Sequence, residues 1–155
     1  NLTSLALLLF VCASSLPGNA AALRKRHVQV QPAQKRDKVI ATRNITGTLK
    51  GFEVGDYVHA VIKLSKGKEE SYFVGSPGLD YFLALHKGEQ LSLTYQIVDS
   101  YIEEAGGVQR IERLNGARAG KLTYAAWWKQ MRAKHSFDAL DKMYSGMVEK
   151  LRLNP

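Results

Sequence analysis

The chain has 155 residues, of which 45% are hydrophobic and 23% are charged. This composition is typical of one globular domain with short extensions and is too apolar for a disordered chain. The 22 Lys and Arg residues outnumber the 14 Asp and Glu residues, and Cys12 is the single cysteine. One cysteine excludes an intrachain disulfide framework and a zinc site built on cysteines, and the length excludes large cofactor-binding folds of about 250 residues.

The first segment has the pattern of an export signal. Residues 2–16 (LTSLALLLFVCASSL) are apolar and uncharged, residues 17–18 (PG) break the run, and residues 19–22 (NAAA) are small. An apolar core followed by a breaker and a small-residue cleavage site is typical of a secretory signal peptide. We therefore expect residues 1–22 to be a signal peptide whose charged n-region is missing, and the mature protein to be periplasmic or secreted without a membrane span.

Three alternatives to a cleaved signal remain open: a membrane anchor, a lipoprotein acylated at Cys12, and a buried helix of the domain. The apolar run is shorter than the roughly 20 residues that a membrane-spanning helix needs. Val11 is larger than the residue that usually precedes an acylated cysteine. The basic residues at 24–26 (RKR) directly after the run, however, favour an anchor with a cytoplasmic C-terminal side.

Positive charge is concentrated outside the middle of the chain. Basic residues exceed acidic ones in residues 24–43 and 121–155, whereas residues 44–120 are slightly acidic. Residues 23–38 are polar and show no periodicity, which predicts a basic flexible arm. The arm is either a solubilising linker or a contact to an anionic surface, and in the second case the contact residues are Arg24, Lys25, Arg26, Lys35, Arg36 and Lys38.

The middle of the chain predicts five strands and one helix. Residues 39–53 are rich in β-branched side chains, with Gly47 and Gly51 where a long strand would bend. Alternating residues 57–64, a turn at 66–68 and residues 71–74 complete a meander. Ser76 and Pro77 then predict a helix start, with a helix running to about Gly88. Alternation returns at 90–102, and residues 108–114 after the next turn predict the fifth strand.

This order of elements resembles that of the five-stranded Greek-key barrel called the OB-fold. The resemblance covers residues 39–116 and lies in element order, without a diagnostic motif. It implies a mainly β protein with helices, in which residues 39–120 form a small barrel (β-β-β-α-β-β) and Leu79, Phe82 and Leu83 plug one end.

Residues 121–155 predict a helical extension of two helices. Thr123 and Ser136 are suited to cap their N-termini. Apolar residues recur at helical spacing in both, which indicates a face packed against the barrel. A basic amphipathic helix on a membrane surface is the alternative.

A barrel followed by two helices also resembles the staphylococcal nuclease family, which carries an Asp-Gly-Asp-Thr context and paired arginines. This chain has Gly55-Asp56-Tyr57 instead and no arginine in residues 44–109. The resemblance therefore implies shape and not nuclease activity, because phosphoryl transfer needs positioned positive charge. The four histidines lie far apart without metal-ligand spacing, so we expect no catalytic set, no metal site and no cofactor.

The sequence thus favours an exported, noncatalytic OB-like binding module for a glycan, lipid or protein of the cell envelope, with nucleic acid a less favoured partner. Barrels of this kind bind across strands two and three, which predicts a groove formed by Tyr57, His59, Lys63, Lys66, Lys68 and Tyr72. The alternative is a structural envelope protein held on an anionic surface by its basic arm and helices, and an enzyme of unfamiliar mechanism is the third hypothesis.

Overall fold

The computed structural model describes residues 37–153. The predicted signal peptide and the predicted arm lie outside these residues, apart from Asp37 and Lys38. Lys38 is the first residue of β1 and pairs with Asp99, so this candidate surface residue belongs to the sheet.

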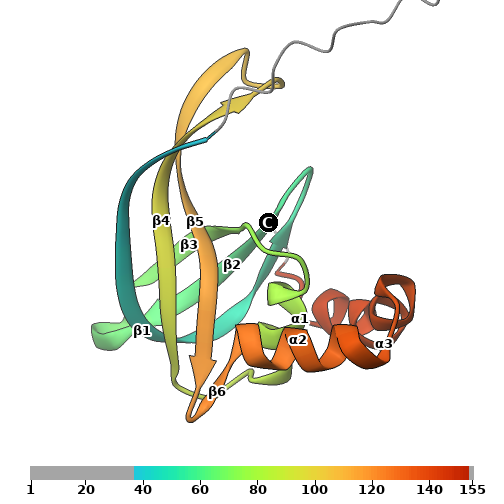
Figure 1. Ribbon diagram of the computed structural model, residues 1–155. Coiled ribbons are helices and arrows are strands. Elements are labelled where there is room, and N and C mark those ends of the chain that lie inside the picture. Colours follow the sequence, from blue (N-terminus) through green and yellow to red (C-terminus); the bar gives the residue numbers. More distant parts are fainter. Residues whose placement is uncertain (1–36, 154–155) are drawn as a thin grey trace, which may run out of the picture. The chain divides into compact units, whose positions relative to one another are not determined.

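The predicted fold class is confirmed: the protein is mainly β, with an OB-like element order and two C-terminal helices (Figure 1). Strands β1 (Lys38–Val54), β2 (Val58–Leu64) and β3 (Glu69–Val74) are followed by helix α1 (Leu79–Leu85) and by strands β4 (Leu91–Ile102) and β5 (Gly107–Ala119). A short strand β6 (Leu122–Thr123) leads into helices α2 (Tyr124–Lys134) and α3 (Phe137–Lys150). A 3-10 turn (Ser65–Gly67) connects β2 and β3.

Strands β1 to β5 close into a ring. β1 pairs antiparallel with β2 and with β4, β2 pairs with β3, and β4 pairs with β5. The ring is completed by a short parallel contact in which Phe73 and Val74 of β3 pair with Arg113 and Leu114 of β5. β6, which the sequence did not predict, pairs with the end of β5.

Strand β1 changes its pairing partner at Gly47, one of the two glycines where a bend was predicted. Residues before Gly47 pair with β4, residues after it pair with β2, and Gly47 itself pairs on both sides. A Cβ atom at this position would lie 2.7 Å from the carbonyl oxygen of Lys63, so the backbone of β2 comes closer here than a side chain allows.

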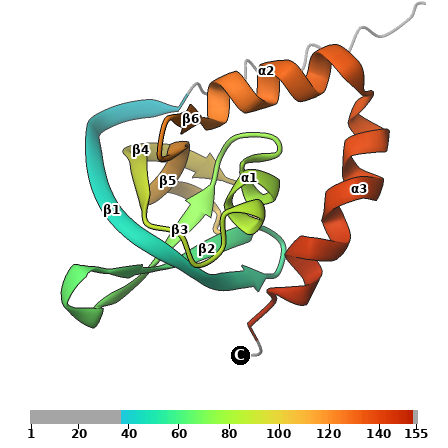
Figure 2. The same cartoon turned by 90° about the horizontal axis from the view of Figure 1, so that it is seen from below.

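Helix α1 closes one end of the ring with Leu79, Phe82 and Leu83, all fully buried, which confirms the predicted plug. The helix begins at Leu79 after Gly78, and not at the predicted Ser76-Pro77, because Gly78 takes a left-handed φ of 74°. Figure 2 shows α1 between the strands on one side and α2 and α3 on the other. The ring interior is filled by alternate residues of the strands: Leu49, Phe52, Ala60, Ile62, Tyr72, Leu91, Leu93, Tyr95 and Leu114.

Helices α2 and α3 are capped as predicted and pack against α1. The Thr123 and Ser136 hydroxyls accept hydrogen bonds from the backbone N–H groups of Ala126 and Ala139. Trp127 lies with its ring centroid 5.6 Å from that of Phe82, so α2 buries this indole against α1, whereas Phe137 of α3 is 45% exposed. Among the helices of residues 37–153, none is long and apolar enough to cross a bilayer.

The segment after α3 joins the barrel wall through an isolated parallel β-bridge between Arg152 and Phe52. The N–H group of Phe52 donates to the carbonyl of Leu151 at 2.9 Å, and the N–H group of Leu153 donates to the carbonyl of Phe52 at 2.8 Å. Leu153 also covers Gly51, where an added Cβ would lie 2.8 Å from its side chain. The edge of β1 that β4 leaves unpaired is thereby protected.

Candidate ligand-binding surfaces

Tyr57 and His59 of the predicted groove lie together on the outer face of β2 and β3, with Phe73 between them. The Phe73 ring centroid lies 5.3 Å from that of Tyr57 and 5.8 Å from that of His59, both edge-on. The Tyr57 hydroxyl donates to Glu104 in the β4–β5 turn at 3.2 Å, and this hydrogen bond raises the pKa of Tyr57. We call Tyr57, His59 and Phe73 the aromatic row.

The three predicted lysines do not join the aromatic row. Lys63 lies four residues farther along β2 than His59, which is about 13 Å in a strand. Lys66 and Lys68 lie in and after the β2–β3 turn. Lys68 forms a 2.5 Å ion pair with Glu70, which raises the pKa of the lysine and lowers that of the carboxyl. The predicted groove is therefore divided between the two ends of the β2–β3 hairpin.

Tyr72 is not on the surface, contrary to the prediction. Its side chain is 0% exposed, its ring centroid lies 4.9 Å from that of Tyr95, and its hydroxyl donates to Glu70. Burial is the main cause that raises the pKa of Tyr72, and the Glu70 carboxylate adds to it. The physical reason is strand alternation: Tyr72 pairs with inward-facing Ala60, and its neighbour Phe73 pairs with His59 and faces out.

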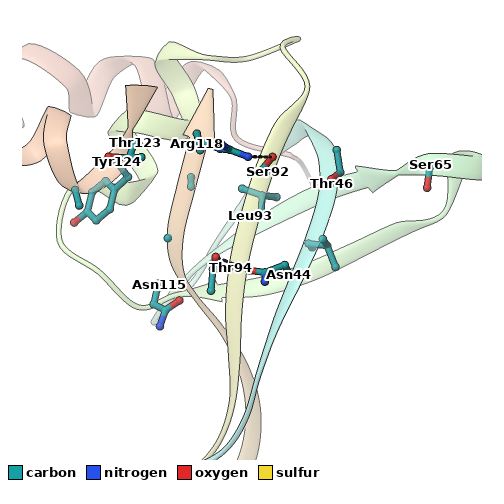
Figure 3. A pocket seen from close by; sticks show the side chains of 14 residues that line it. Asn44, Thr46, Ser65, Ser92, Leu93, Thr94, Asn115, Arg118, Thr123 and Tyr124 are labelled. Atoms are coloured by element: carbon teal, nitrogen blue, oxygen red, sulfur yellow. Dashed lines mark hydrogen bonds between the residues drawn. The ribbon is translucent and has the colours of Figure 1, made fainter. Parts of the chain in front are cut away.

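A second surface, which the sequence did not predict, is an open polar groove of about 830 Å³ on the outer side of β1, β4 and β5 (Figure 3). Its floor consists of two rows of residues that pair across the three strands. One row is Asn44, Thr94 and Gly116, and the other is Thr46, Ser92 and Arg118. The second row continues to Thr123, which pairs with Arg118 from β6. We call this surface the polar groove.

Asn115 lies at the edge of the polar groove in a β-bulge. Thr94 pairs with Gly116 and Tyr95 pairs with Leu114, so Asn115 is the extra residue of β5. Its Oδ1 atom is buried and has no hydrogen-bond partner within residues 37–153. Bulges re-aim side chains and are frequent beside functional sites.

The described residues show no constellation for catalysis by a metal. No group of three or more His, Cys, Asp or Glu side chains that could hold a metal ion occurs in residues 37–153. His59 contacts Phe73, and His86 lies 3.1 Å from Glu89 on the helix-closed end. The two histidines therefore lie in separate environments.

Comparison with known proteins gives no relative: no family model, no curated protein and no solved structure matches the chain. The function must therefore be inferred from the two surfaces themselves, since one fold supports many functions.

Proposed function

We propose that the protein is an exported, noncatalytic OB-like binding module that holds a neutral glycan of the cell envelope on the aromatic row. The observation that carries the proposal is the row itself: Tyr57 is 41% exposed, and Phe73 and His59 are half-buried beside it. The row lies next to the β1–β2 and β4–β5 turns, which meet at the Tyr57–Glu104 hydrogen bond. Barrels of this class bind oligosaccharides and oligonucleotides on the same strands.

The chemistry around the aromatic row favours a neutral sugar over a nucleic acid. An aromatic ring stacks on the apolar C–H face of a sugar, and nearby carboxylates accept hydrogen bonds from its hydroxyls. Glu104 lies at the row, and Glu53 accepts a 2.8 Å hydrogen bond from Ser71 on the same outer face. These carboxylates repel a phosphate backbone, whose binding depends on Lys and Arg contacts.

The proposal is tested by titrating the protein with a panel of neutral oligosaccharides while backbone amide shifts are followed by NMR. We expect saturable shifts in residues 57–59 and 71–73, and loss of binding in Tyr57→Ala. Phe137→Ala is the matched control, because Phe137 is an exposed aromatic residue on α3, and it should bind as the natural protein does. No binding across the panel, or binding that Tyr57→Ala leaves unchanged, contradicts the proposal; shifts in these residues with lipid micelles or envelope proteins instead would reassign the ligand.

A second candidate function is a structural protein held on an anionic envelope surface. The observation that favours it is a set of exposed cations on the two C-terminal helices: Lys129, Arg132, Lys134, Lys142 and Lys150. Binding to anionic vesicles that falls steeply with salt, and that is lost when residues 23–36 are deleted, would support this function.

A further inference from the structure

The polar groove combines neutral hydrogen-bonding groups with one available cation. Its polar side chains on β1 and β4 are Asn44, Thr46, Ser92 and Thr94, all small and uncharged, and Ile45 and Leu93 of the same strands also line it. Thr94 donates to Asn44 at 2.8 Å, which leaves further acceptor and donor positions of both side chains toward the solvent. From these residues and Arg118 we propose that the polar groove is a second binding site, for a sugar that carries a carboxylate or sulfate group.

Within the described part of the chain, Arg118 has no carboxylate partner, unlike the other arginines of β5. Arg110 pairs with Asp99 at 2.9 Å, and Arg113 pairs with Asp37. Within residues 37–153, the Arg118 guanidinium donates a long hydrogen bond of 3.5 Å to the Ser92 hydroxyl. The planar guanidinium is therefore free to bind a carboxylate or sulfate through two parallel hydrogen bonds.

Gly116 leaves the backbone of β5 bare in the floor of the groove. The φ angle of Gly116 is not positive, so the backbone conformation does not require a glycine. Packing does not require one either, because an added Cβ would lie 3.5 Å from Cβ of Thr94, which is an ordinary van der Waals contact. A glycine inside a strand marks a bulge, a bend or a place where another group approaches the backbone closely, and Gly116 directly follows the bulge at Asn115. Because Gly116 has no side chain, it leaves room for a ligand to reach the backbone in the floor of the polar groove.

Within residues 37–153, Oδ1 of Asn115 accepts no hydrogen bond. A buried oxygen without a donor is unfavourable, and Asn115 is one of the residues that line the groove. A sugar hydroxyl is a suitable donor. Asn115 and the four small polar residues thus account for hydroxyl recognition, and Arg118 accounts for the anionic group.

The groove does not suit a nucleic acid. Base recognition in single strands needs exposed aromatic faces, and the aromatic residue that lines the groove, Tyr124, is buried and donates its hydroxyl to the carbonyl of Pro77 at 2.6 Å. One guanidinium also cannot follow a chain of phosphates. This site is independent of the aromatic row, which lies on β2 and β3.

The test compares two pairs of sugars by calorimetry: an oligogalacturonate with its methyl ester, and a sulfated disaccharide with its unsulfated form. Each neutral partner keeps the hydroxyls and removes the charge. We expect the anionic member of at least one pair to bind at least about tenfold more tightly, with Arg118→Gln removing that advantage. Gly116→Val, which fills the floor, should abolish binding altogether.

The matched control is Lys121→Gln, which removes an exposed cation in the nearby β5–β6 turn without touching the groove; it should bind as the natural protein does. Tyr57→Ala should also leave this binding intact, so failure of the aromatic row and failure of the polar groove are distinguishable.

Unfolding midpoints of all variants identify any loss that comes from misfolding, and Arg118→Lys, if folded, should bind more weakly than the natural protein. Equal affinity for charged and neutral partners, no binding of any of them, or binding that Arg118→Gln leaves unchanged overturns the proposal.

Discussion

The two ends of the barrel differ in how they are held together. At the end closed by helices, Phe82 contacts His86, Tyr124 and Trp127 with ring centroids 4.6 to 6.1 Å apart. At the other end, β1, β4 and β5 continue together beyond the ring (Figure 1), and Tyr101 and Val108 are 53% and 54% exposed. The free energy of folding is therefore concentrated around α1, and the outer strands depend on backbone pairing and surface ion pairs, which makes them the first region to open.

The largest expected effect is on the helix-closed end. Phe82→Ala leaves a cavity among three aromatic rings and should lower the free energy of unfolding by about 3–5 kcal/mol, measured by denaturant titration. Leu85→Ala on the same helix removes a side chain that is 37% exposed, and its loss should be clearly smaller. Equal losses for the two variants would mean that α1 does not close the barrel.

A smaller, pH-dependent effect is expected at Asp80 in the first turn of α1. Burial raises the pKa of its carboxyl above 3.8, with Asp141 adding to the shift and backbone N–H groups opposing it. Burial also raises the pKa of Tyr124, and the charge of Asp80 adds to that shift. The native state thus holds the Asp80 proton to higher pH than the unfolded chain, so stability is lost as pH rises from 3.8 through the native pKa.

Asp80→Asn should therefore unfold at higher temperature than the natural protein at pH 7, by less than Phe82→Ala lowers the unfolding temperature. The difference should shrink as the pH falls toward 3.8, where the unfolded carboxyl also takes up its proton. Thermal unfolding followed at several pH values measures both. A gain that is the same at pH 3 and pH 7 would show that the charge of Asp80 is not its cause.

The smallest effect is expected in the outer strands. Arg110→Ala removes the exposed ion pair with Asp99, and pairs in solvent contribute little. We expect no measurable change in the midpoint of global unfolding, but faster amide hydrogen exchange in residues 98–102 and 107–111. A shifted midpoint would show that the two ends unfold as one unit.

The sequence predicted the elements well where the signal was local. Alternation, β-branched composition and turn residues located β1 to β5 to within a few residues, with β5 longer than predicted, and the capping residues Thr123 and Ser136 were correct. The sequence did not predict β6 because a strand of two residues is too short to show a hydrophobic period. It did not predict the hydrogen bond between Leu153 and Phe52 because these residues lie about a hundred positions apart in the chain.

The candidate sites were predicted less well, because they depend on register between strands. The alternation of four residues around Tyr72 did not reveal which face of β3 is inward; pairing with Ala60 decides it. The two rows of the polar groove form only when β1, β4 and β5 pair in the correct register, which the sequence of each strand alone does not show. A local signal was nevertheless present: small polar residues at every second position, Asn44 with Thr46 and Ser92 with Thr94, lie in two predicted strands.

The pairing of residues 151–153 with Phe52 has a consequence for biosynthesis. The edge of β1 at Phe52 is covered only by residues that are synthesised about a hundred positions later. A chain that is still emerging from the ribosome therefore keeps this edge of β1 unpaired after its other strands have been made. Such an edge can pair with another chain. Nascent molecules that stall before Leu153 should associate with one another, whereas completed molecules should not.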